Sequence, residues 1–79
     1  MTERSEDYGR TLMGWIEALQ IMAPHYPGGI NTRSPLHGEH DEVYAIKAEF
    51  LPEDSEDGQK LLSMGWFVCE YTNCWMRFT

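Results

Sequence analysis

The stretch that decides the fold is residues 65–79, GWFVCEYTNCWMRFT. Aromatic and β-favouring residues flank Thr72 and Asn73, which is the pattern of a β-hairpin. A two-residue turn at Thr72 and Asn73, or a four-residue loop from Tyr71 to Cys74, gives the same register, in which Tyr71 faces Cys74. Because side chains alternate along a strand, the register divides the hairpin into two faces.

The two faces of the predicted hairpin differ in polarity. The first face is uncharged and is the predicted core; its members are Phe67, Cys69, Tyr71, Cys74, Met76 and Phe78. The second face carries two charges; its members are Trp66, Val68, Glu70, Trp75, Arg77 and Thr79. Charged side chains are seldom fully buried, so we expect the second face to remain partly open. Two tryptophans beside an arginine have the composition of a protein-interface hot spot. Two alternatives are that the N-terminal helix covers this face, and that Arg77 stacks on Trp75 as a local cation–π pair.

The N-terminal half is predicted to hold one helix and one long loop. Residues 1–6 are polar and predicted to be frayed, and Ser5 is the predicted N-cap of a helix over residues 7–23. Its apolar residues recur at helical spacing and form one stripe: Tyr8, Leu12, Trp15, Ile16, Leu19 and Met22. Residues 24–41 hold three prolines and three glycines and are predicted to be a long loop.

The remaining segment is predicted to hold a strand and a short helix. Residues 42–51 alternate as a β-strand does, and residues 52–64 read as a helix capped by Asp54 or Ser55. Gly65 is placed to end this helix. The element order helix, strand, helix, strand, strand therefore predicts one domain over residues 1–79.

The predicted fold class is α+β, with two layers in the order α-β-α-β-β. A strand–helix–strand unit normally makes a right-handed parallel crossover, so we expect a mixed three-stranded sheet that ends in the antiparallel hairpin. Both helices are expected on one side of the sheet, over the first hairpin face.

The composition excludes several classes of function. Thirteen acidic residues against six basic ones give a net charge of −7, which disfavours direct binding of nucleic acid. No apolar run is long enough to span a membrane, and no secretory signal is visible, so the expected location is the cytoplasm. The acidic charge is interpreted either as a solubility device or as a surface that imitates phosphates for a basic partner. The candidate residues for such a negative edge are Glu39, Asp41, Glu42, Glu49, Glu53 and Asp54.

The cysteines and histidines allow a zinc hypothesis. Zinc prefers a tetrahedral site with two to four Cys or His ligands, and the candidates are His37, His40, Cys69 and Cys74. The alternative is two solvated histidines and two core thiols. The predicted register places Cys69 and Cys74 diagonally, beyond disulfide reach, so free thiols are expected. No catalytic or cofactor motif is present, which predicts a protein that is not an enzyme.

From Glu39 onward the chain resembles a group of short uncharacterised proteins encoded by bacteriophages. The shared pattern is an acidic Glu39-His40-Asp41 leading into a strand, an acidic helix start, a leucine-x-x-x-Gly-Trp exit at residues 61–66, and a tryptophan near the end followed by an aromatic, here residues 75–78. It covers about half of the chain and leaves out the helix over residues 7–23. The resemblance implies a phage accessory protein made in a bacterial cytoplasm, and it implies no catalytic residue.

The expected function is therefore an interaction module that inhibits or modulates a host protein with a basic surface. Many small acidic phage proteins block host defences, so the resemblance implies a nucleic-acid mimic directed at defence machinery such as restriction or CRISPR systems. The expected contacts are the negative edge and the second hairpin face. The alternatives are a zinc-stabilised mini-domain and a homodimeric structural module.

Overall fold

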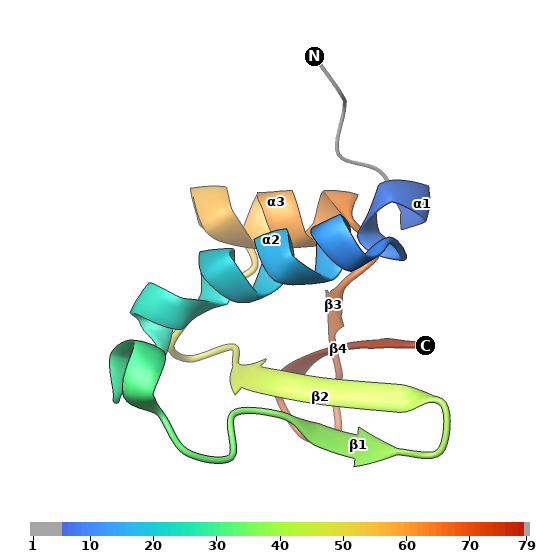
Figure 1. Cartoon of the computed structure of the whole chain (residues 1–79). Coiled ribbons are helices and arrows are strands. Elements are labelled where there is room, and N and C mark those ends of the chain that lie inside the picture. The colour runs from blue at the N-terminus through green and yellow to red at the C-terminus, as the bar shows by residue number, and fades with distance from the viewer. Residues whose placement is uncertain (1–5, 79) are drawn as a thin grey trace.

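The computed structural model describes residues 6–78, without the side chain of Glu6, and has two layers (Figure 1). The helix layer consists of α1 (Glu6–Gly9), α2 (Leu12–Met22) and α3 (Glu56–Ser63). The sheet layer has four strands in the order β1-β2-β4-β3: β1 (His37–Glu39), β2 (Glu42–Lys47), β3 (Phe67–Val68) and β4 (Cys74–Phe78). Two 3₁₀ helices, η1 (Ala23–His25) and η2 (Gly29–Asn31), lead from α2 toward β1. The predicted α+β class is confirmed.

The first predicted helix is broken in two at Thr11. The Thr11 hydroxyl accepts a hydrogen bond from the Gly14 N–H at 3.0 Å and donates one to the Tyr8 carbonyl at 2.6 Å, so α2 has its own N-cap. A Cβ atom added to Gly14 would lie 2.0 Å from the Tyr8 carbonyl oxygen, so only glycine allows this break. The single helix over residues 7–23 is wrong because threonine bonds the backbone better as a cap than inside a helix. Ser5, residues 1–5 of the predicted frayed segment, and Thr79 lie outside the described residues.

The apolar stripe predicted for this helix is divided between its two sides. The side of α2 that faces the core is built on small residues and Met22; its buried members are Gly14, Ala18 and Met22. Leu12, Ile16 and Leu19 are exposed on the opposite side. Gly14 and Ala18 let the helix backbone approach the core closely, so α2 rests on them rather than on its leucines.

The sheet has one strand more than predicted, and all of its pairs are antiparallel. The extra strand is β1, inside the predicted loop over residues 24–41; it is short and exposed, and its sequence HGE has no apolar alternation. Strand β4 lies between β2 and β3, so these two strands run in the same direction without being neighbours. The predicted three-stranded mixed sheet is therefore wrong. The connection from β2 to β3 does not make them neighbours, because β4, which comes later in the chain, pairs with both and lies between them.

The hairpin register is shifted by two residues from the predicted one. Phe67 pairs with Met76 and Val68 with Trp75, and the Cys69 N–H donates to the Cys74 carbonyl at 2.8 Å. The two cysteines are therefore opposed and not diagonal. A shift of two preserves which side chains share a face, so the membership of the two predicted faces remains valid for the described residues.

The burial of the two hairpin faces is the reverse of the prediction except at Met76, which is buried as predicted. The helices cover the second face, where Trp66 is 1% exposed, Trp75 0% and Arg77 2%. The first face, predicted as the core, lies on the outer side of the sheet; Phe67 and Phe78 are exposed, and Tyr71 is exposed in the connecting loop. The core instead joins the tryptophans to helix residues; its buried members are Ala18, Met22, Ile46, Leu51, Leu61, Met64, Trp66 and Trp75.

Arg77 is the reason why a charged face can be the core face. Its Nη1 donates hydrogen bonds to the Gly9 carbonyl at 3.0 Å and to the Met64 carbonyl at 2.9 Å. These carbonyls lie at the C-terminal ends of α1 and α3, where backbone acceptors lack helical partners and the helix dipole is negative. The guanidinium also lies 5.4 Å from the Trp15 ring centroid and 6.0 Å from that of Trp66. A buried arginine therefore holds two helix ends against the sheet.

Helix α3 is shorter than the predicted helix over residues 52–64, but the residues that end it are among those predicted. Ser55 is the N-cap, and its side chain accepts from the Gly58 N–H at 3.0 Å. Gly65 follows the helix with φ 93°, a conformation that glycine adopts without strain. The helix exit therefore delivers Trp66 directly into the core.

Candidate functional site

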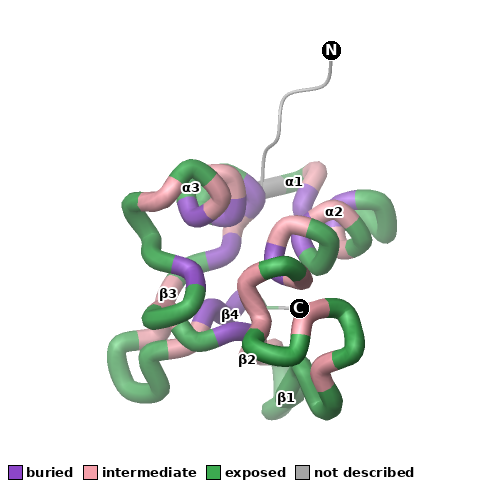
Figure 2. The backbone as a smooth tube through the Cα atoms, turned by 90° about the vertical axis from the view of Figure 1, so that its left-hand side faces the viewer, coloured by how far each residue is buried: buried purple, intermediate pink, exposed green. Residues whose placement is uncertain are grey.

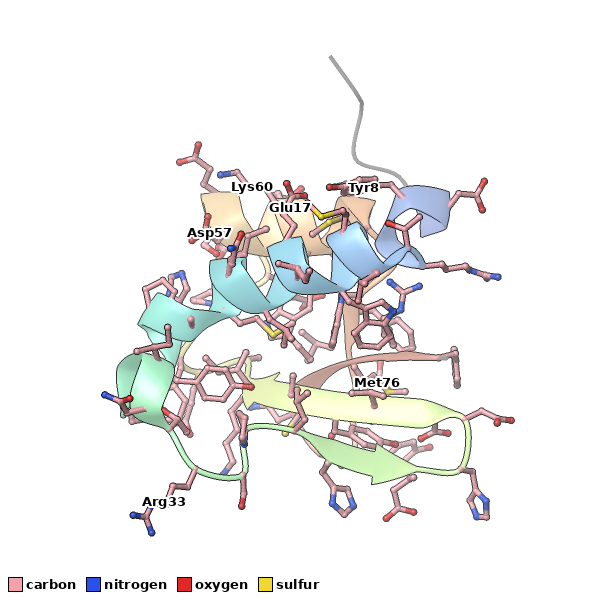
Figure 3. All side chains as sticks on the ribbon, viewed as in Figure 1. Tyr8, Glu17, Arg33, Asp57, Lys60 and Met76 are labelled. Atoms are coloured by element: carbon pink, nitrogen blue, oxygen red, sulfur yellow. The ribbon has the colours of Figure 1, made fainter. Side chains whose placement is uncertain are left out.

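The outer side of the sheet carries a contiguous set of side chains, which we call the open sheet face. The register aligns His37, Tyr44, Met76 and Phe67 in one row across all four strands. The next row holds Glu39, Glu42 and Phe78. Figure 2 shows β1 exposed along its length, and in Figure 3 Met76 projects from β4 on the side away from the helices.

The apolar part of the open sheet face is built around Met76. Phe67 pairs with Met76 across the strands and Phe78 follows two residues later on β4; the two rings contact each other with centroids 5.7 Å apart, and Met76 itself is buried. Phe78 is 58% exposed, Phe67 is also exposed, and Tyr44 is half-buried. An aromatic patch on the side of a sheet that no helix of the described chain covers is available for contact with another molecule.

An acidic pair borders this patch. Glu39 and Glu42 are directly opposite across β1 and β2, an arrangement in which like charges destabilise a sheet. His37 Nε2 lies 3.0 Å from Glu39 Oε1, and the Tyr44 hydroxyl donates a hydrogen bond to Glu42. The hydrogen bond with Glu42, followed by burial, raises the pKa of Tyr44 to about 12, so the phenol stays a donor. The row beside Phe78 therefore concentrates negative charge where a cationic group would relieve repulsion.

The predicted negative edge forms two separate groups. Glu39, Asp41 and Glu42 lie at the turn between β1 and β2, and the residues Glu49, Glu53 and Asp54 follow the other end of β2. A six-residue strand holds the groups roughly 17 Å apart. The first group adjoins the open sheet face, and the second leads into the N-terminal end of α3.

The predicted hot spot does not lie at the surface. Trp66, Trp75 and Arg77 are buried under the helices, Val68 is half-buried there, and Glu70 is exposed in the hairpin loop. The prediction that this face stays open is therefore wrong. Of the alternatives stated for it, cover by the N-terminal helix is the observed one: Trp15 of α2 meets Trp66 edge-on with ring centroids 5.6 Å apart.

The candidate zinc ligands do not converge. Within residues 6–78 no three His, Cys, Asp or Glu side chains are placed to share a metal ion. His37 and His40 are exposed near β1, and Cys69 and Cys74 are half-buried free thiols; only His37 and Cys74 of the four line a common surface cavity. The four residues therefore do not form the tetrahedral site that the zinc hypothesis requires.

A second exposed apolar surface, which we call the helix groove, was missed by the sequence reasoning. A cavity of about 330 Å³ lies between α2 and the η2 region, and its lining includes Ile16, Leu19, Tyr26, Ile30, Pro35 and Leu36. The stripe continues along α2 to Leu12, which is 77% exposed. Only Glu17 and Gln20 of the eleven residues in α2 carry charged or amide side chains, so its apolar surface is wider than one core contact needs. The width of this apolar surface was the sequence signal that could have predicted the helix groove.

A polar contact fixes the connection after α2 to α3. His25 Nε2 lies 2.7 Å from Asp57 Oδ2, and the Lys60 ammonium lies 3.6 Å from Asp57 Oδ1. The hydrogen bond from His25, with a smaller contribution from Lys60, lowers the pKa of the Asp57 carboxyl. Figure 3 shows Asp57 and Lys60 on the helix layer, away from the open sheet face, so this contact is a structural tie.

Comparison with known proteins adds no identity: no family model, curated protein or solved structure matches the chain. Among residues 6–78, every helix is too short or too polar to cross a lipid bilayer. The function must therefore be argued from the open sheet face and the helix groove.

Proposed function

We propose that this chain is a binding protein without catalytic activity, and that its open sheet face contacts a basic surface of a partner protein. The observation that carries the proposal is the opposed pair Glu39 and Glu42 beside the exposed Phe78. An aromatic anchor with charged residues at its rim is how protein interfaces combine affinity with specificity. The partner surface that fits has lysine or arginine side chains around an apolar centre.

The resemblance of the second half of the chain supports a more specific form of the proposal. In that form the chain is a phage accessory protein of the bacterial cytoplasm that inhibits or modulates a host protein. The net charge of −7 suits a partner that normally binds nucleic acid, because a phosphate-binding site is basic. Binding there would exclude the nucleic acid without any chemistry on it.

The first test substitutes the two parts of the open sheet face separately. Phe78→Ser is expected to weaken capture of a partner from a bacterial lysate by about tenfold or more, because it removes the anchor. The double variant Glu39→Gln, Glu42→Gln is expected to weaken capture mainly at low salt. At about 0.5 M salt, screening already weakens the electrostatic attraction between these carboxylates and the partner. Quantitative mass spectrometry of the captured proteins measures both effects.

The matched control for this test is Leu12→Ser, which makes a similar apolar-to-polar change on the helix groove. It is expected to capture the same partner as the unmodified chain. Circular dichroism of every variant checks that the fold is retained. Equal capture by all the variants, or loss with Leu12→Ser alone, would contradict a contact through the open sheet face.

The helix groove supports a second candidate function, self-association. The apolar surface of α2 is wider than its contact with the core, and two copies of α2 packed about a two-fold axis would bury Leu12, Ile16 and Leu19. Analytical ultracentrifugation is expected to show a dimer that Leu12→Glu converts to a monomer and Phe78→Ser leaves intact. A monomeric mass for the unmodified chain at millimolar concentration would rule this candidate out.

A further inference from the structure

The two cysteines of the hairpin are direct cross-strand neighbours. Residues 67 and 68 pair with residues 76 and 75, and the Cys69 N–H bonded to the Cys74 carbonyl at 2.8 Å continues this ladder by one pair. Directly opposed residues point to the same face of a sheet. In a hydrogen-bonded antiparallel pair their Cα atoms are about 5.5 Å apart, inside the range of about 4.4–6.8 Å that disulfides span.

The hairpin loop, residues 70–73, surrounds the Cys69 sulfur with donors. Hydrogen bonds from the Thr72 backbone, then from its hydroxyl and from the Tyr71 backbone, lower the pKa of the Cys69 thiol against the opposing effects of burial and Glu42. The Asn73 N–H donates to the Cys69 carbonyl at 2.8 Å and holds the loop closed over this residue. Because the thiolate is the attacking form, Cys69 is favoured as the nucleophile of the pair.

The second cysteine is accessible from the open sheet face. Cys74 lines a surface cavity of about 370 Å³ together with Thr72, Tyr44 and His37, and its thiol lies 3.4 Å from the Thr72 carbonyl oxygen. A small molecule in this cavity reaches Cys74, whose cross-strand neighbour is Cys69. The opposed pair of cysteines and the cavity that gives access to Cys74 therefore lie at the same place on the sheet.

We propose that Cys69 and Cys74 form a reversible dithiol–disulfide site that is oxidised by low-molecular-weight disulfides. The Cys69 thiolate attacks one sulfur of the small disulfide, which breaks its S–S bond and releases one small thiol. The Cys74 thiolate then attacks the Cys69 sulfur of the mixed disulfide and releases the second small thiol. Two protein thiols are oxidised, the small disulfide is reduced, and the two protein protons end on the two released thiols.

The bridge has a defined structural consequence. The Cβ atoms of opposed strand residues are about 4.5–5.5 Å apart, whereas a disulfide draws them to about 3.8 Å, so the bridge tightens the hairpin and is easily reduced again. Tyr71 is 97% exposed in the loop that the bridge closes. The proposal depends on the two thiols alone and goes beyond the proposed partner contact.

The test treats the folded chain with a neutral small disulfide, bis(2-hydroxyethyl) disulfide, and follows intact mass. The unmodified chain is expected to lose two hydrogens, about 2 Da, with no adduct remaining, and mild dithiothreitol should reverse the change. Cys74→Ser is expected to stop at a mixed disulfide on Cys69. Cys69→Ser is expected to form its adduct several-fold more slowly. Repeating the reaction in urea should favour adducts over the internal bridge, because the strands no longer hold the thiols together.

The proposal is overturned if the folded chain ends with two adducts, or with only a covalent dimer. Equal adduct rates for Cys69→Ser and Cys74→Ser would remove Cys69 from its role as the attacking thiol. Because the readout is mass alone, failure of partner capture leaves this result unaffected, and the reverse also holds.

Discussion

Replacing Arg77 with methionine is expected to lower the free energy of unfolding by about 3–5 kcal/mol. The substitution removes the shared donor of the Gly9 and Met64 carbonyls at the ends of α1 and α3. It also withdraws the guanidinium from the Trp15 and Trp66 rings. A chain of this length has a total stability of roughly 4–12 kcal/mol, so the variant should be substantially unfolded. Urea denaturation followed by circular dichroism measures the loss.

The matched control is Arg33→Met, the same chemical change at an arginine that projects from the connection between η2 and β1 (Figure 3). It is expected to change stability by less than about 0.5 kcal/mol. Arg77→Lys should be intermediate, because lysine keeps the charge but cannot copy the planar geometry of the guanidinium. A loss below about 1 kcal/mol for Arg77→Met would mean that the two helix ends do not depend on this side chain.

Arg77 also explains where the sequence reasoning reversed the hairpin. Alternation and turn chemistry correctly divided the hairpin residues into two faces, because the division depends only on which residues alternate along each strand and not on the exact pairing. Which face is buried depends on partners far away in the chain, and the acceptors of Arg77 lie 68 and 13 residues earlier. The general rule that charges avoid the core then selected the wrong face.

Sequence signals were reliable for features whose hydrogen bonds join residues close together in the chain. The cap at Ser55 and the turn at Gly65 were predictable because their hydrogen bonds and dihedral angles involve a few neighbouring residues. Strand β1 was not, since among residues 6–78 it pairs with β2 alone and its side chains are exposed. The break at Thr11 was missed because an apolar periodicity runs through it unchanged.

The candidate site was predictable only in part, for the same reason. The acidic residues around Glu39 were identified from composition, but their position beside Phe78 requires the pairing of β1 with β2 and of β2 with β4. The opposed cysteines require the two-residue shift of the hairpin register. Both features are products of long-range pairing, which one sequence does not encode in a readable local pattern.

Replacing Trp75 with phenylalanine is expected to cost about 2–3 kcal/mol, which is about 1–2 kcal/mol more than the same change at Trp66. Both rings are fully buried, so the lost volume is the same. The two indoles differ in hydrogen bonding. Trp75 Nε1 donates to the Leu51 carbonyl at 2.7 Å, whereas Trp66 Nε1 has no partner among residues 6–78.

This pair of variants isolates the value of one buried hydrogen bond, because each partner serves as the control for the other. Trp75→Phe leaves the Leu51 carbonyl buried without its donor, and that carbonyl sits where the chain leaves β2 for α3. Trp66→Phe removes a donor that is already unsatisfied, so part of its lost packing is offset. Urea denaturation followed by far-ultraviolet circular dichroism measures both. If Trp66→Phe is the more damaging change, the edge-on contact of Trp66 with Trp15 outweighs the hydrogen bond of Trp75 in holding the helices to the sheet.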